Sequence, residues 1–175
     1  SHQNLPDMRY GQDPNFRFTL ALIIYKTVLR YTAEQHDKSY VITPLAPDNF
    51  YLEMTKNKVR LSWDRVEDPQ EPSATPTGYI VYTSIGDADF DNGTYVKGEN
   101  YETELQPDIL YHFKVTAANK GGQSFPTEVL SAYYHPAAKN TVMIINGFHR
   151  LSSPAIRNNN TEQGFDLDED PGITY

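Results

Sequence analysis

The sequence contains no cysteine, so disulfide bonds and thiolate metal sites are excluded. Basic residues are fewer than acidic ones: the sequence has 15 Lys and Arg and 23 Asp and Glu, which gives a formal net charge of -8. This charge opposes the counterion release that drives binding to nucleic acid, so we expect no nucleic-acid partner. No apolar run approaches the roughly 20 residues that a membrane span needs, and no signal peptide is visible. The first residue is Ser1 rather than Met, which favours processing or a fragment of a longer polypeptide.

Motifs for catalysis and for cofactor binding are also missing. There is no Gly-x-Ser-x-Gly elbow, phosphate loop or dinucleotide fingerprint. The histidines form no i, i+4 pair and no His-Glu-x-x-His motif; they are His2, His36, His112, His135 and His149. We therefore expect no catalytic residue, no cofactor and no metal ion in this chain.

An acidic tail near the C-terminus partly resembles a calcium-binding loop. Asp166, Asp168 and Asp170 alternate as in an EF-hand, but the glycine comes one place late, at Gly172. We interpret this segment as a solvated acidic tail.

The composition indicates a folded chain rather than a disordered one. Aromatic residues make up 13% of it, and its 13 Tyr suit half-buried sheet faces. Asp13 and Pro14 predict a helix start, with Asp13 as the cap. Apolar residues then recur at three- and four-residue spacing to about Gln35, which predicts an amphipathic helix that packs against a domain. They are Phe16, Leu20, Ile23, Ile24, Val28, Leu29 and Tyr31.

A sandwich-like pattern follows the prolines at 44 and 47, which read as a linker. Residues 50–54 and 59–63 alternate apolar and polar side chains around a turn at 56–57, and Trp63 ends the second strand. Residues 79–83 form a third strand, residues 101–105 a short one, and a last one runs from about Thr127 to Tyr134, after Pro126.

The pattern Leu-x-Pro-x-x-x-Tyr at 105–111 leads into an alternating strand at 111–117. It is the sequence form of a tyrosine corner, in which a Tyr hydrogen-bonds backbone a few residues upstream. Together with Trp63 and the run Ala118-Asn119-x-x-Gly122-x-Ser124, it resembles the fibronectin type III family. The resemblance implies a seven-stranded immunoglobulin-like sandwich. With the flanking segments read from their residues, the expected fold is mainly β: the sandwich is preceded by one amphipathic helix and followed by an extra strand and acidic tail. The expected structural core is Trp63, Tyr79, Val81, Leu105, Tyr111, Phe113 and Val115.

Two features could carry a binding function. Residues 64–78 contain three prolines and several carboxylates, so we expect a solvated loop, long for its position. Tyr82, Tyr133 and Tyr134 are a candidate aromatic surface for stacking on sugars, although ordinary cross-strand packing explains them as well. His112 is expected to point outward on its strand as a solvated residue.

Flanking segments suggest neighbouring domains. Residues 141–145 are continuously apolar, which predicts a strand buried on both faces at the start of a further domain. Residues 1–31, with a loop of the type Ser-His-Gln-Asn-Leu before the helix, resemble the C-terminal end of the zinc-dependent N-acetylmuramoyl-L-alanine amidase fold. In that family the zinc ligands lie upstream of this segment, so none is carried onto this chain. We divide the chain into 1–44, 45–136 and 137–175.

The order of these segments is similar to multidomain bacterial cell-envelope proteins of the amidase-like or xanthan lyase-like type. The resemblance implies a noncatalytic spacer module in a secreted or periplasmic enzyme, with the flanking domains as its partners and the activity in the parent protein. The alternative is a module that binds cell-wall glycan, polysaccharide or protein through loop 64–78 and exposed tyrosines.

Overall fold

The computed structural model of the chain describes residues 4, 7, 10–11, 13–145, 155–158 and 163–166. The chain divides into two units: Ser39–Thr141 is one, and the described residues of 1–38 and 142–175 belong to the other. Within the described residues, no helix has the length and apolar character needed to cross a membrane.

The predicted helix is α2, Pro14–Gln35. The Asp13 carboxylate accepts the Asn15 N–H at 2.9 Å and caps the first turn. At the other end Asp37 has a positive φ of 48°, and the N–H of Lys38 reaches the Ala33 carbonyl at 2.9 Å. This is a Schellman motif with aspartate in the place that glycine usually takes. Apolar side chains of α2 remain exposed, by 54% to 57% at Ile23, Ile24 and Val28.

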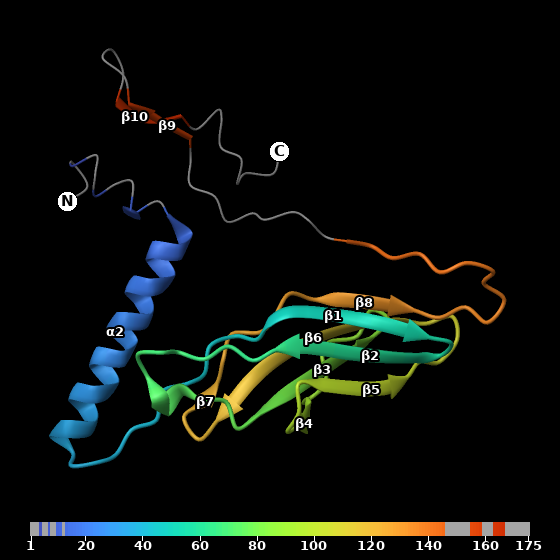
Figure 1. Ribbon diagram of the computed structural model, residues 1–175, viewed down its shortest axis with the longest axis horizontal. Coiled ribbons are helices and arrows are strands. Elements are labelled where there is room, and N and C mark those ends of the chain that lie inside the picture. Colours follow the sequence, from blue (N-terminus) through green and yellow to red (C-terminus); the bar gives the residue numbers. More distant parts are fainter. Residues whose placement is uncertain are drawn as a thin grey trace. The chain divides into compact units, whose positions relative to one another are not determined.

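Two antiparallel sheets face each other in the unit Ser39–Thr141 (Figure 1). The first has the order β1-β2-β5, with β1 at Asp48–Thr55, β2 at Lys58–Asp64 and β5 at Asn100–Glu104. The second has the order β4-β3-β6-β7, and β8 also pairs with β6. Its strands are β3 at Gly78–Ile85, β4 at Thr94–Val96, β6 at Leu110–Asn119, β7 at Gly122–Gln123 and β8 at Leu130–Tyr133. The predicted seven-stranded sandwich is confirmed, with its last strand split into β7 and β8.

The split corrects the expected boundary of the last strand. Pairing starts earlier than Thr127, at Gly122, and is interrupted until Leu130. Pro126 has no N–H to donate, so the regular ladder cannot run through it. Hydroxyl groups on either side continue the contact with β6: Ser124 Oγ accepts the Ala117 N–H at 2.9 Å, and Thr127 Oγ1 accepts that of Val115.

The core lies between the sheets because alternate residues of each strand point inward. All seven residues expected in the core are buried there, and Phe113 and Val115 are fully buried. Trp63 packs edge-on against Tyr79 with ring centroids 5.3 Å apart, and the Phe50 ring centroid lies 6.5 Å from that of Trp63. The contact between Trp63 and Tyr79 joins the two sheets, because Trp63 belongs to β2 and Tyr79 to β3.

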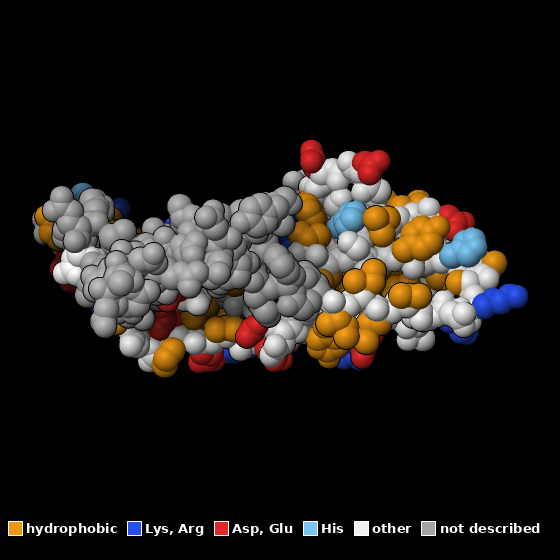
Figure 2. All heavy atoms as spheres, turned by 90° about the horizontal axis from the view of Figure 1, so that it is seen from above, with side chains coloured by type: hydrophobic (Ala, Val, Ile, Leu, Met, Phe, Trp, Pro, Cys, Tyr) orange, Lys and Arg blue, Asp and Glu red, His pale blue; other side chains and the backbone are white. Residues whose placement is uncertain are grey.

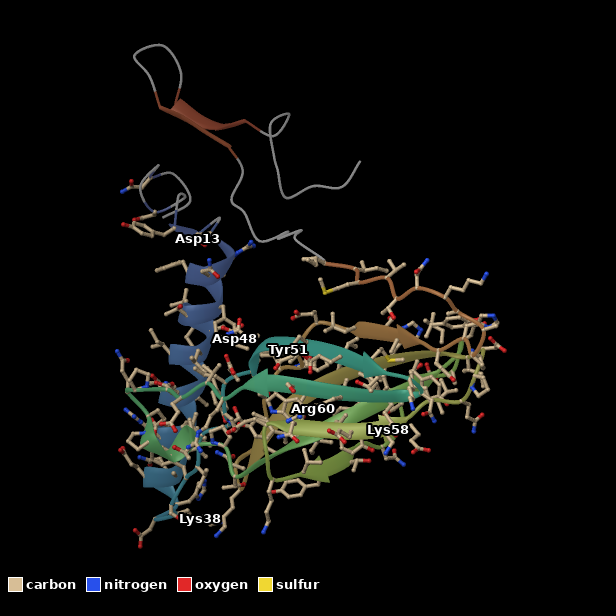
Figure 3. All side chains as sticks on the ribbon, turned by 45° about the vertical axis from the view of Figure 1, so that its right-hand side comes forward. Asp13, Lys38, Asp48, Tyr51, Lys58 and Arg60 are labelled. Atoms are coloured by element: carbon tan, nitrogen blue, oxygen red, sulfur yellow. The ribbon has the colours of Figure 1, made fainter. Side chains whose placement is uncertain are left out.

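Charged residues line the outward face of the three-stranded sheet. Lys58 and Arg60 project from β2 (Figure 3), opposite Glu104 and Glu102 of β5 in the strand register. The ion pairs measure 3.6 Å for Lys58 and 3.9 Å for Arg60, and both are exposed. Exposed ion pairs contribute little to stability, so their main effect is to make the outward face of this sheet charged.

Two expectations for the C-terminal segment were wrong. Residues 141–145 form no strand, and the side chains of Val142 through Ile145 are 78% to 90% exposed. A buried strand needs neighbours on both edges, and none of the described residues pairs with this run. After this run, β9 at Ala155–Asn158 and β10 at Gln163–Asp166 form an antiparallel pair, where the sequence analysis places no strand. The acidic tail beyond Asp166 lies outside the described residues.

Candidate functional site

The tyrosine corner is present at the start of β6. Tyr111 Oη accepts the backbone N–H of Gln106 at 3.2 Å, five residues upstream, while its ring is buried beside Phe113. Asp108 lies between them with a positive φ of 62°, a conformation that aspartate tolerates better than most residues. The corner thus fixes the loop that precedes the central strand.

Asp108 also forms hydrogen bonds with the segment at the end of β8. Its N–H donates to the Tyr134 carbonyl at 2.9 Å, and its carboxylate lies 2.5 Å from His135 Nδ1 and 3.3 Å from Tyr133 Oη. The hydrogen bond from His135 is the main reason that the pKa of the Asp108 carboxyl falls below its usual value. Partial desolvation, and then the Asp108 charge, raise the pKa of Tyr133. The corner pattern at 105–111 predicts the local hydrogen bond of Tyr111, but no local signal points to His135, 27 residues after Asp108.

Tyr82 lies on the outward face of β3 within a polar network. Its hydroxyl donates to Gln123 Oε1 at 2.6 Å, and the same oxygen accepts from Thr116 Oγ1 at 3.0 Å. Lys114 Nζ lies 5.5 Å from the centroid of the Tyr82 ring and 4.1 Å from that of Phe90. The ring and the hydroxyl of Tyr82 are therefore already engaged by neighbouring side chains.

The three candidate tyrosines do not form a contiguous patch: Tyr82 and Tyr133 share the outward face of the five-stranded sheet but lie apart on it. Tyr133 faces Leu110 in the register of β6, whereas Tyr82 faces Lys114, about 13 Å further along that strand at the usual rise per residue. Tyr134 packs against the buried core. Figure 2 shows hydrophobic side chains interspersed with polar groups and histidine over the sandwich. Tyr133, 53% exposed, is the member of the set that is most accessible for stacking.

The long loop before β3 is less solvated than expected. It contains a short 3₁₀ turn, η1, at Pro72–Ala74, and Ala74, Pro76 and the carboxylate residue Glu71 are buried. Glu71 is 5% exposed and accepts the Ser73 hydroxyl at 2.7 Å. Carboxylates in the sequence suggested solvation, and burial of Glu71 depends on a partner that composition does not reveal.

The histidines and carboxylates that the structure describes form no metal-binding cluster. In the described part of the chain, no three His, Asp or Glu residues are grouped so that they could hold a metal ion. His112 is half-buried on the outward face of β6 with Nδ1 2.7 Å from Ser131 Oγ, and His36 ends α2. His2, His149, Asp168 and Asp170 lie outside the described residues.

Two buried polar atoms in the core have no hydrogen-bond partner among the described residues: Trp63 Nε1 and Tyr79 Oη. Burial raises the pKa of Tyr79 to about 12, and the nearby charge of Glu99 adds to the increase. Tyr79 is therefore neutral at physiological pH and is unsuited to act as a base.

Comparison with known proteins relates this geometry to one family. Residues 45–133 match the family model described as the fibronectin type III domain. Similar solved structures include the twitchin kinase region from C. elegans, at 20% identity and a TM-score of 0.49, and an fn3 domain of human contactin 1, at 18% and 0.47. A myokine structure has 23% identity and a TM-score of 0.44.

The extent of these matches differs from one structure to the next. The matched part covers 57% of this chain but 18% of the twitchin region, 60% and 90% for contactin 1, and 53% and 99% for the myokine. The comparison with curated proteins gives no match.

Proposed function

Because the chain belongs to the fibronectin type III family, we propose that its sandwich is a noncatalytic spacer or scaffold module that orients its neighbours in a multidomain protein. Domains of this family are common spacers in multidomain proteins, but architecture alone gives no activity. The observation that carries the proposal is the anchored exit of the chain. The hydrogen bonds of Asp108 to Tyr134 and His135 fix the place where the polypeptide leaves the last strand.

The proposal predicts a rigid block without catalysis. Nitrogen-15 relaxation of the chain should give one rotational correlation time for the amides of 39–135. Assays with muropeptides and with xanthan-type polysaccharide should give no product, with an active amidase and an active lyase as positive controls. Turnover by the purified chain, or independent motion of the two sheets, would overturn the spacer role.

We further propose a parent protein in the bacterial cell envelope. The support is the similarity of residues 1–31 to the end of an amidase fold, together with the order of helix, prolines, sandwich and apolar run. In this proposal 1–44 closes an upstream enzyme domain, 45–136 is the module, and 137–175 opens a further domain. The location is extracytoplasmic, and the activity belongs to an amidase-type or lyase-like domain elsewhere in the parent.

The full-length reading frame tests this parent directly. Residues encoded upstream of Ser1 should show histidines and a glutamate at the spacing of a zinc amidase. An upstream sequence without such a set would remove the amidase-like parent, and the spacer role of the sandwich would be unaffected.

The second candidate function is binding of glycan or protein, and the exposed ring of Tyr133 favours it. Sedimentation with peptidoglycan or soluble polysaccharide tests this idea. Saturable binding that Tyr133→Ala abolishes, and that Tyr51→Ala on the other sheet leaves intact, would support a binding module. Tyr51 is a suitable control because its ring is exposed to a similar extent, at 50%.

A further inference from the structure

A short segment ahead of the family-matched region is part of the sandwich. Residues 39–43 precede residue 45, where the match begins, yet they belong to the same unit as the sheets. Ile42 is 0% exposed, as deeply buried as Phe113, although it lies in no strand. It is also absent from the central core cluster, so it is buried by a separate set of contacts.

Those contacts satisfy both polar backbone groups of Ile42. Its N–H donates to Ser73 Oγ at 3.2 Å, and its carbonyl accepts Asn119 Nδ2 at 2.8 Å. Ser73 belongs to the long loop before β3, and Asn119 ends β6. Two separate parts of the sandwich therefore bind one residue that has no strand neighbour.

The two side chains are held in place by their own partners. The single proton of the Ser73 hydroxyl goes to Glu71, which leaves its lone pairs free to accept the Ile42 N–H. Asn119 Nδ2 also contacts the Ser73 carbonyl at 3.1 Å, and Asn119 Oδ1 accepts the Gly121 N–H at 2.7 Å. Burial of Glu71 in the long loop thus has a consequence, because it orients the hydroxyl that receives the entering chain.

Glycine in the β6–β7 turn makes room for the segment. A Cβ atom on Gly121 would lie 2.3 Å from the Val41 carbonyl oxygen and 2.9 Å from its carbon. The colliding atoms are backbone, so a side chain at 121 would force residues 39–43 away rather than displace a flexible group. Gly121 has no positive φ, so alanine is compatible with its own backbone.

From these contacts we infer that residues 39–43 form a clasp: a docked segment, held by Ser73, Asn119 and Gly121, that fixes where the chain enters the sandwich. The long loop before β3 serves to receive this segment. The inference deepens the proposed spacer role, on which it rests, since a spacer that orients neighbours must fix both its entry and its exit.

Amide hydrogen exchange in the full chain tests the clasp. In the wild-type chain the Ile42 amide should be protected. Gly121→Ala should accelerate its exchange by at least about tenfold, because displacing the segment breaks its buried hydrogen bonds. Gly98→Ala is the matched control, since a Cβ there meets nothing closer than 3.9 Å, and should leave the Ile42 amide unchanged. Central amides of β3 and β6 should stay protected in both variants and so report an intact fold.

Asn119→Ala gives an independent test, with Asn140→Ala, at an exposed position, as its control. Asn119→Ala should accelerate hydrogen exchange of the Ile42 amide, while the amides of β3 and β6 remain protected from exchange. An Ile42 amide that exchanges freely in the wild-type chain, or that keeps its protection in both Gly121→Ala and Asn119→Ala, overturns the clasp. That result would leave the spacer proposal standing, whereas catalytic turnover would remove the spacer role and leave the exchange data unaffected.

Discussion

Thr127 and Val115 are joined by a hydroxyl that takes the place of a backbone carbonyl. Thr127 Oγ1 accepts the Val115 N–H at 3.0 Å, while the Thr127 N–H donates to the Val115 carbonyl at 2.8 Å. The hydroxyl proton goes to the Glu128 carbonyl at 3.0 Å. One side chain therefore completes the hydrogen bonding of a fully buried strand residue at the point where the sheet ladder is interrupted.

Replacing Thr127 by Val should lower the free energy of unfolding by about 1 to 3 kcal/mol, because the buried Val115 N–H loses its acceptor while the shape is kept. Denaturant unfolding measures the change. Thr127→Ser should retain most of the stability, and Thr94→Val, at an exposed strand position, should change it little. Equal stability of Thr127→Val and wild type would show that the hydroxyl is dispensable.

Removing the hydroxyl of Tyr111 should weaken the corner. Tyr111→Phe leaves the Gln106 N–H without its acceptor, so the free energy of unfolding should fall by about 1 to 3 kcal/mol. The matched control is Tyr51→Phe. The Tyr51 ring is half exposed, so loss of its hydroxyl should change the free energy of unfolding little. Thermal unfolding of both variants compares the two positions, and similar melting temperatures would contradict a stabilising corner.

Acid should weaken the tether at Asp108. Its folded-state pKa is lowered from 3.8, so the stabilisation is present above the unfolded pKa and is lost as the pH falls through the folded value. Asp108→Asn keeps a residue that tolerates positive φ but removes the charge. The melting temperature of wild type should exceed that of the variant at pH 6, and the difference should shrink as the pH falls below 3.8. A difference that is constant with pH would assign the effect to the backbone.

High pH should lower the stability of the folded chain through ionisation of Tyr79. Its folded-state pKa of about 12 exceeds the unfolded value of 10.0, so the folded state binds more protons between these values and stability falls as pH rises through them. Tyr79→Phe removes this proton together with a buried hydroxyl that has no hydrogen-bond partner in the geometry of the described residues. The variant should match or exceed wild type in unfolding free energy at pH 7, and its advantage should grow at pH 11. A marked loss at pH 7 would reveal a partner for the hydroxyl.

The sequence predicts the sandwich well because its core residues alternate within single strands. Trp63 and Tyr111 stand at fixed places in local patterns, and their burial follows from period-two alternation and from the turn before β6. The start of α2 is predicted for a similar reason, since Asp13 caps a helix using only the next two residues. Local chemistry was sufficient for these elements.

Contacts between distant residues were not predictable in the same way. The clasp at Ile42 and the tether from Asp108 to His135 each join segments that no periodicity connects. The apolar run 141–145 predicts a strand from composition, but a strand forms only where a second segment supplies hydrogen bonds. The glycines at 121 and 122 were a usable signal, because adjacent glycines after a strand often mark a close approach of backbone.

The charged face of the three-stranded sheet bears on how such modules tolerate crowding. Glu102 and Glu104 stand on β5, which is the outer strand of its sheet, and face Arg60 and Lys58 across the ladder. A strand from another chain that paired with this edge would have to place its side chains beside these hydrated, charged side chains. The charged residues of β5 therefore disfavour the addition of another strand at this edge of the sheet.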